Sequence, residues 1–256
     1  MVFTGVCPTD AELFSYYANY PVHENLSPVT IQRYNELLDG FEAFRQTNRM
    51  LDVGCGAGLF LEQAAKRGWE VHGTEYGERA LVSCRSRGIR IIEGALDPAN
   101  YAPESFDVIC SFEVIEHVPR PKDELDRMVE LLRPAGVLYV TTPNYRSLGH
   151  AMAGSGWSVV NYPEHLNYFT PRTLRAIAAQ KGLRPLRVLT TGVSLVRLRV
   201  RHADDSQRKA AVLTEQEDLR NRLETNPFLR LAKHMVNAVL NTTGSGDSMK
   251  ALFVKP

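Results

Sequence analysis

A glycine-rich segment gives the first sign of chemistry in this 256-residue sequence. In LDVGCGAGLF (residues 51–60), Gly54, Gly56 and Gly58 stand within five positions, directly behind an apolar run. Glycine permits sharp bends and lets the backbone approach a ligand closely. Backbone amides at the start of a helix attract anionic or polar groups. The segment therefore predicts a loop, between a strand and a helix, that holds a ligand.

An acid follows this loop at a useful distance. Glu75 ends the next apolar run, EVHGTE (residues 70–75), and lies 21 residues after Gly54. A carboxylate so placed suits the hydroxyls of a ribose, and loop and acid together fit any adenosine cofactor. The spacing is GxGxG followed by Leu59, whereas a dinucleotide site favours GxGxxG. An NAD(P)-binding oxidoreductase and a glycine turn without a ligand are the alternatives.

The elements around these residues follow a regular order. Short apolar runs alternate with helical stretches, and such alternation indicates βαβ units and a parallel sheet, hence an α/β fold. The predicted helices of this region are 59–68, 77–88, 121–136 and 170–182. The predicted strands are 50–54, 70–75, 89–94, 106–112, 136–142, 184–191 and 250–256.

Two further segments frame this core, which we expect at residues 49–192. Residues 1–48 predict an N-terminal helical cap, with helices over 9–47 that begin near Thr9 or Asp10 and at Ser27. Residues 193–245 predict a helical insertion before a final strand at 246–256. One of its helices is the charged stretch 214–224, and the other has an apolar face of Phe228, Leu231, Met235, Val236, Val239 and Leu240. That face must pack on the domain, close the site as a lid, or join a second subunit in a homodimer.

Composition excludes several classes of protein. The net charge of +1 gives no reason to expect a nucleic-acid or anionic-membrane partner. No apolar stretch approaches the roughly 20 residues of a membrane span, and the first residues lack a secretory signal. The four cysteines are scattered without a CxxC pair, so we expect neither a disulfide framework nor a metal site. Free cysteines of this kind favour a reducing compartment, and we therefore expect a cytoplasmic location.

Five motifs, taken in order, identify a family. LDVGCGAG, GTEYG, IRIIEGALD, FDVICSFEVIEHVPRP and ELLRPAGVLYVTTPN stand at the ends of successive predicted strands. As a set they resemble the class I S-adenosylmethionine-dependent methyltransferases, above all the small-molecule branch that includes ubiquinone-biosynthesis O-methyltransferases and glycan and natural-product methyltransferases. The resemblance covers about residues 49–192 and 250–256. It implies a Rossmann-like, seven-stranded, mostly parallel sheet with helices on both faces, S-adenosylmethionine as cofactor and a small-molecule acceptor. A relative that binds the cofactor without catalysis is the remaining alternative.

The resemblance assigns roles to the glycine loop and the acid. Gly54, Gly56 and Gly58 would hold the methionyl part of the cofactor. Asp52 would orient the loop or meet the cofactor's amino group. Glu75 would accept both ribose hydroxyls, because hydrogen bonds from a diol to a carboxylate are strong and sensitive to geometry.

The adenine side departs from the family pattern. Tyr76 would cover one face of adenine, and Phe112 ends its strand at the cofactor's edge. The family often has an acid just past the third strand, but Ala95 and Leu96 stand there in this sequence. We therefore expect backbone groups and apolar packing to hold adenine, with no acid from Asp97.

Two histidines are the candidates for catalysis. His117 follows Glu113 and Glu116 in EVIEHVPRP, at the sheet edge where ligands bind in such folds. As a free imidazole it can take a proton from a substrate hydroxyl, although a histidine that only orients the loop is the alternative. His165, in NYPEHLNYFT (residues 161–170), is the second candidate base. Two histidines at this edge favour oxygen over nitrogen or carbon as the methylated atom.

Overall fold

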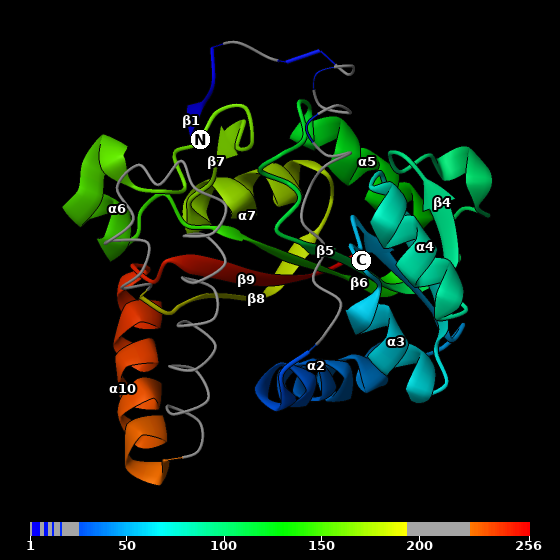
Figure 1. The fold of residues 1–256 in the computed structure, drawn as a ribbon, viewed down its shortest axis with the longest axis horizontal. Helices are drawn as coiled ribbons and strands as arrows, with labels where there is room; N and C mark the ends of the chain where they lie inside the picture. Colours follow the sequence, from blue (N-terminus) through cyan, green and yellow to red (C-terminus); the bar gives the residue numbers. More distant parts are fainter. Residues whose placement is uncertain (1, 6–7, 10–11, 13–15, 17–25, 194–225) are drawn as a thin grey trace.

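A seven-stranded sheet forms the centre of the molecule in the computed structural model, which describes residues 2–5, 8–9, 12, 16, 26–193 and 226–256 (Figure 1). The strand order is β4-β3-β2-β5-β6-β9-β8. Only β9 runs antiparallel to its neighbours, so the prediction of a mostly parallel α/β sheet is confirmed. The strands are β2 (Arg49–Val53), β3 (Glu70–Glu75), β4 (Arg90–Glu93), β5 (Phe106–Phe112), β6 (Leu132–Pro143), β8 (Arg184–Thr191) and β9 (Ser248–Val254).

Helices cover both faces of this sheet, as predicted. Neighbouring strand residues face opposite ways, so Met50 and Val108 join one apolar cluster while Leu51 and Ile109 join the other. The first cluster packs against α2 (Pro28–Phe41), α3 (Leu59–Lys66) and α4 (Glu78–Ser86). The second packs against α5 (Pro121–Leu131) and α7 (Pro171–Gln180), and Figure 1 shows α7 across the sheet from α2. The remaining α-helices described are α6 (Leu148–Ala153) and α10 (Pro227–Thr243).

The strand order brings the predicted site residues together. β2 pairs with β3 on one side and with β5 on the other, so the chain reverses its winding direction there. Ligands bind outside the carboxyl ends of strands at such a point. The glycine loop after β2, Glu75 at the end of β3 and Phe112 at the end of β5 therefore face one crevice.

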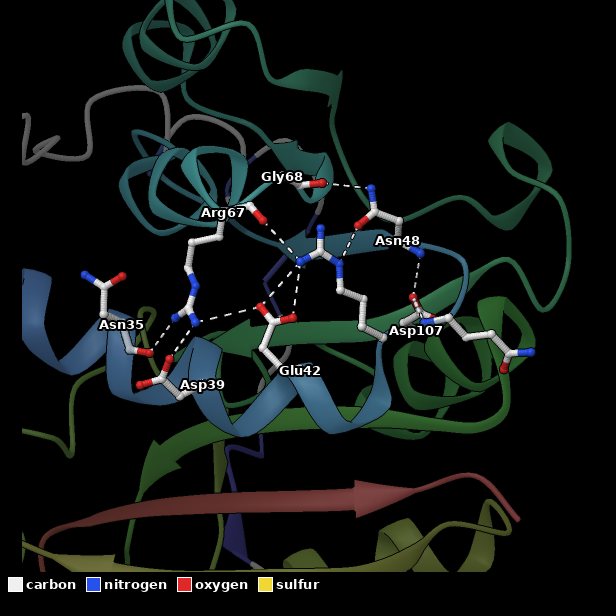
Figure 2. Close-up of polar contacts among 9 residues, drawn as sticks. Asn35, Asp39, Glu42, Asn48, Arg67, Gly68 and Asp107 are labelled. Carbon is white, nitrogen blue, oxygen red and sulfur yellow. Dashed lines mark hydrogen bonds and ion pairs between the residues drawn. The ribbon is translucent and has the colours of Figure 1, made fainter.

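Polar contacts fix α2 against the sheet (Figure 2). The guanidinium of Arg67 donates to the carbonyl of Asn35 (2.8 Å) and to Asp39, both on α2. Arg45 donates to the Arg67 carbonyl (3.1 Å). At the start of β5, buried Asp107 accepts the amide of Asn48 (2.7 Å). These bonds tie α2 and the turn that follows it to α3 and β5.

Some boundaries differ from prediction. The helix predicted over 121–136 ends at Leu131, and β6 begins at Leu132 rather than at 136. Pro134 and the left-handed Ala135 (φ 59°) interrupt regular pairing, and the register shifts between Phe106 and Val108 opposite them. The sequence of this segment resembles a helix end, but pairing with β5 extends the strand through it.

The two flanking segments are only partly described. Within 9–47, the helix begun by Ser27 and Pro28 is confirmed, as is the helix of 226–240. The possible start at Asp10 and the charged helix 214–224 lie outside the described residues. The cap also holds a strand that was not predicted, β1 (Val2–Phe3), which pairs with β7 (Asn167–Tyr168). Among the described residues, no helix is long and apolar enough to cross a membrane.

Candidate active site

A cavity of about 930 Å³ opens at the carboxyl ends of β2, β3 and β5. Its walls come from the glycine loop, the ends of these strands, α2, α5 and the loop before β7. Gly58 is the only predicted site residue that does not line this cavity. Those that do are Asp52, Gly54, Gly56, Glu75, Tyr76, Ala95, Leu96, Phe112, His117 and His165.

The three glycines serve three different needs, and all have left-handed backbones. A Cβ on Gly54 would lie 2.6 Å from the Val114 side chain, so the packing of Val114 on the turn leaves no room for a larger residue there. A Cβ on Gly56 would meet nothing within 4 Å, so that face of the loop is open to a ligand. A Cβ on Gly58 would lie 2.4 Å from Ile89 and 2.9 Å from the Cys84 sulfur. Gly58 thus fits the loop against α4, behind the place where a cofactor would lie.

Glu75 holds the loop together as well as facing the cavity. Its Oε2 accepts the amide of Gly56 (2.8 Å), and its Oε1 accepts the amides of Tyr76 (2.7 Å) and Gly77 (3.1 Å). A carboxylate accepts about four hydrogen bonds. Oε1 is therefore filled, and Oε2 has room for one ribose hydroxyl. Binding of both hydroxyls, as predicted, requires one of the amides to give way.

Asp52 offers an acceptor to a cationic ligand group. Its side chain is buried, and its Oδ1 has no hydrogen-bond partner among the described residues. Burial, then the charge of Glu75, raises the pKa of Asp52 well above its usual range. A ligand ammonium would supply the missing donor and favour the ionised carboxylate. The site therefore fits the amino group of S-adenosylmethionine.

Apolar side chains line the part of the cavity where we predict adenine. Ala95 and Leu96 line it, while Tyr76 stands half-exposed at the mouth. Asp97 accepts the amide of Ala99 (3.0 Å) and caps a short helical turn, outside the cavity wall. Phe112 packs edge-on against Phe60, with ring centroids 4.9 Å apart. These walls suit a flat aromatic base held between side chains.

His117 and His165 lie side by side, with ring centroids 4.7 Å apart. Nδ1 of His117 is 2.6 Å from the carbonyl oxygen of Glu164, and Nδ1 of His165 is 2.6 Å from that of Val159. A carbonyl only accepts, so each Nδ1 carries a proton and donates it to the carbonyl, which fixes the orientation of both rings. Burial, then the nearby His165, lowers the pKa of His117 to about 4. His117 is therefore neutral at pH 7, and it is a weaker base than a free imidazole.

Backbone contacts bring the two histidine loops together. The carbonyl of Glu116 accepts the amides of Leu166 (2.8 Å) and Asn167 (2.9 Å). The side chain of Asn167 donates to the carbonyl of Val118 (2.8 Å). Glu113, at the end of β5, has a left-handed backbone (φ 54°), a strain typical of functional sites. The predicted meeting of His117 and His165 at one edge thus rests on this pairing of loops.

The same corner could hold a metal ion, which the sequence did not predict. Glu116, His117 and His165 each offer one ligand atom, and these atoms lie within 4.8 Å of one another. Two imidazoles and a carboxylate are a ligand set that divalent cations accept. Hydrogen bonds from Nδ1 to carbonyl oxygens orient metal-bound histidines in the same way as they orient bases.

Other wall residues escaped the sequence analysis. Tyr34 of α2 lines the cavity, although no pattern in the sequence places it in the site. Burial, then the charge of Asp52, raises the pKa of Tyr34 to about 12. Ser158 and Val159, from a loop with no predicted role, also line the cavity. No local pattern marks these residues, because only the docking of α2 and the folding of the loop bring them there.

Comparisons with known proteins agree with this geometry. A family model described as a methyltransferase domain matches residues 24–188. The ubiquinone biosynthesis O-methyltransferase of Aeromonas salmonicida is 27% identical over 176 residues, 64% of this chain and 72% of that protein. That of Azoarcus sp. is 29% identical over 202 residues, 70% and 84% of the two chains. The structure of a SAM-dependent methyltransferase from Archaeoglobus fulgidus has a TM-score of 0.60 at 17% identity, covering 96% of this chain and all of that one.

These matches decide between the adenosine cofactors left open above. The family match spans more than half of the chain and includes the glycine loop, Glu75 and both histidines. Leu59 stands where a dinucleotide site would have glycine, and the oxidoreductase alternative is not favoured. The chain belongs to the methyltransferase-domain family and is a class I S-adenosylmethionine-dependent methyltransferase.

Proposed function

We propose that this enzyme methylates an oxygen of a small hydroxylated acceptor. The observation that carries the proposal is the pair of imidazoles, His117 and His165, on the cavity wall with Nδ1 bound to backbone carbonyls. A hydroxyl needs to lose its proton to become a good nucleophile, whereas a neutral amine attacks without such help. The curated relatives described above carry O-methyltransferase in their names, which supports the same choice of atom.

The proposed cofactor contacts follow the cavity wall. Asp52 takes the ammonium, Glu75 takes a ribose hydroxyl, and the amide face at Gly56 borders the methionyl part. Tyr76, Ala95, Leu96 and Phe112 enclose adenine. Gly54 and Gly58 shape the loop through its packing on Val114 and α4.

Methyl transfer then needs alignment and one proton acceptor. When bound, S-adenosylmethionine supplies a methyl group on a positively charged sulfur. Held by Asp52 and Glu75, the cofactor would offer that methyl group to the acceptor oxygen. Nε2 of His117, or of His165 beside it, takes the hydroxyl proton. Because burial lowers the pKa of His117 to about 4, its imidazole is in the neutral, basic form at pH 7.

The test compares histidine variants in a methyl-transfer assay over phenols, catechols and amines. His117→Ala and His165→Ala should lower kcat/KM by about 10²- to 10⁴-fold, the usual contribution of general-base catalysis. Binding of S-adenosylhomocysteine should stay within about twofold of the wild type, well under the 1.4 kcal/mol of a tenfold change. His234→Ala, on the exposed face of α10, is the matched control.

Three results would count against this function. Full activity in both variants removes the base role. Transfer to amines alone removes the choice of oxygen. Cofactor binding without turnover on any acceptor supports the non-catalytic alternative. A parallel assay after exhaustive chelation distinguishes histidines that act as proton acceptors from histidines that bind a metal ion. If activity is lost on chelation and restored by a divalent cation, the cation binds between Glu116, His117 and His165.

We also propose that segment 193–245 joins two copies of the chain, in the cytoplasm. The described part of this segment, α10, buries Leu240 but leaves apolar side chains in solvent, including Phe228 at 82% and Met235 at 63% exposure. Exposed apolar faces of this kind mark interaction surfaces. Sedimentation should show a dimer for the wild type and a monomer for Met235→Glu. A wild-type monomer at assay concentration would refute the contact.

A further inference from the structure

Two cysteines far apart in the sequence meet directly behind the glycine loop. Cys55 lies between Gly54 and Gly56, and Cys84 lies in the last turn of α4. Their sulfur atoms are 3.7 Å apart, and both are free thiols. The Cys84 thiol also donates to the carbonyl of Gly56 (3.2 Å). The thiol pair therefore contacts the same loop that carries the cofactor site.

The packing leaves room for these sulfurs at two neighbouring glycines. A Cβ on Gly73 would lie 2.7 Å from the Cys55 sulfur, and a Cβ on Gly58 would lie 2.9 Å from the Cys84 sulfur. Cys84 is fully buried, while Cys55 lines the cavity. A small oxidant therefore reaches the pair through the cofactor cavity.

We propose that Cys55 and Cys84 form a redox modification site, in which a disulfide between them switches off cofactor binding. A hydroperoxide or a small disulfide such as oxidised glutathione is the oxidant. With a hydroperoxide, the thiols lose two electrons and two protons as the sulfur–sulfur bond forms, and the oxygen–oxygen bond breaks to give an alcohol, or water in the case of hydrogen peroxide, together with one water. With oxidised glutathione, its disulfide bond breaks and two glutathione thiols leave.

The chemistry of the pair favours this reaction. A hydrogen bond from Cys55, with smaller effects of Arg87 and Arg85, lowers the pKa of the Cys84 thiol, while burial and the charge of Glu75 oppose this shift. The same hydrogen bond, together with burial, raises the pKa of Cys55. The thiolate is the reactive form in both oxidation and disulfide exchange. Because its partner sulfur is already in contact, the first oxidised species is resolved within the protein.

Closing the disulfide must distort the loop. The sulfur atoms have to move from 3.7 Å apart to the bonded distance of about 2.05 Å. Cys84 is set in the buried face of α4, whereas Cys55 stands in a turn of left-handed glycines. The loop therefore moves toward α4. That movement strains the bonds from the amide of Gly56 to Glu75 (2.8 Å) and from the amide of Cys55 to the carbonyl of Thr74 (3.1 Å).

Ligand binding and oxidation oppose each other in this scheme. If the disulfide weakens cofactor binding by a given factor, bound cofactor disfavours the disulfide by the same factor. A tenfold effect corresponds to a rise of about 30 mV in the reduction potential of the pair at saturating ligand. The enzyme would thus be most sensitive to oxidation when its cofactor is scarce.

The experiment measures S-adenosylhomocysteine binding by calorimetry before and after oxidation of the full chain. Hydrogen peroxide, and separately oxidised glutathione, should produce a protein lighter by two hydrogen atoms, with a Cys55–Cys84 crosslink in its peptide map. Affinity should fall about tenfold or more, within the usual range of coupling between sites. Dithiothreitol should restore it. Added S-adenosylhomocysteine should slow the loss of free thiols.

Cysteine variants make the result specific. Cys84→Ser should resist the oxidant-dependent loss of affinity. Cys110→Ser removes a buried thiol in β5 and should respond like the wild type. A crosslink with unchanged affinity would overturn the proposal, as would no Cys55–Cys84 crosslink, or an equal loss of affinity in Cys84→Ser. All readouts concern cofactor binding, so failure here leaves the proposed oxygen methylation untouched, and failure of that function leaves this test intact.

Discussion

Glu75 combines two tasks in one carboxylate. It accepts three backbone amides that shape the glycine loop, and it keeps one acceptor position for a ligand hydroxyl. In the binding mode that we propose, the cofactor depends on a group that also orders the glycine loop. Removing its charge should damage both tasks, since hydrogen bonds to charged groups are the stronger ones.

Glu75→Gln should weaken S-adenosylhomocysteine binding by about 10- to 100-fold, equivalent to about 1.5–3 kcal/mol for a hydrogen bond to a charged acceptor. The glutamine keeps the shape but places an amino group against amide donors. Calorimetric titration measures the change. Glu78→Gln, on the exposed first turn of α4 and off the cavity wall, is the matched control. Equal affinity in both variants would refute the ribose role.

Some site residues could be predicted from the sequence because their roles are local. A strand end places Glu75, and a left-handed turn demands glycine at 54. Tyr34 could not be placed, because helical spacing says which side of α2 is buried but not what it meets. The contact between Cys55 and Cys84 joins a loop to a helix 29 residues away, and no motif records it.

The glycine loop, as an element, depends on its fit against α4. Gly58 begins α3 with a left-handed backbone (φ 75°), and its missing side chain lets Ile89 and Cys84 pack closely. The sequence assigned this glycine to the cofactor because the motif treats the three glycines alike. The close packing against Ile89 and Cys84 shows that the third glycine has a structural role, whatever it contributes to the cofactor.

Gly58→Ala should lower the free energy of unfolding by about 3 kcal/mol or more, from left-handed strain together with overpacking. Gly88→Ala is the control: its φ is 72°, and a Cβ there meets nothing within 4 Å. It should lose only the strain part, about 1–2 kcal/mol. Urea unfolding measures both. Equal losses of unfolding free energy in the two variants would mean that close packing against Ile89 and Cys84 adds nothing to the cost of a side chain at position 58.

Among whole elements, three strands were predicted most closely. The limits of β3, β5 and β8 agree with prediction because each is bounded by local turn signals or by the end of an apolar run. The start of β6 was missed by four residues, since Leu132 and Arg133 continue a helical pattern. Pairing with Phe106 overrides that local preference.

At the scale of the molecule, Asp107 joins three separate parts of the chain. It accepts the amides of Gln46, Thr47 and Asn48, and it pairs with Arg133 of β6. Burial opposes its ionisation, but the Thr47 amide, Arg133 and the other two amides together lower the pKa of Asp107. The ionised carboxylate therefore stabilises the fold above its unfolded-state pKa of about 3.9.

Asp107→Asn should destabilise the protein by about 3–5 kcal/mol at pH 7, because Arg133 loses its buried partner. The difference from wild type should stay constant down to about pH 4 and shrink below it, as Asp107 is protonated in both states. Urea unfolding across this range measures it. Asp126→Asn breaks an exposed pair with Lys181 and should cost less than about 1 kcal/mol. A pH-independent difference would contradict the ionic role.

The place of β9 between β6 and β8 also bears on how the chain is synthesised. β8 ends at Thr191, and its sheet partner β9 begins at Ser248, 57 residues later. At translation speeds of about 5–20 residues per second, β8 waits about 3–11 seconds for that partner. An unpaired strand is a template for pairing with another chain. Residues 184–191 are therefore one segment through which nascent copies on one messenger can associate, and pausing of the ribosome between these two strands prolongs the risk.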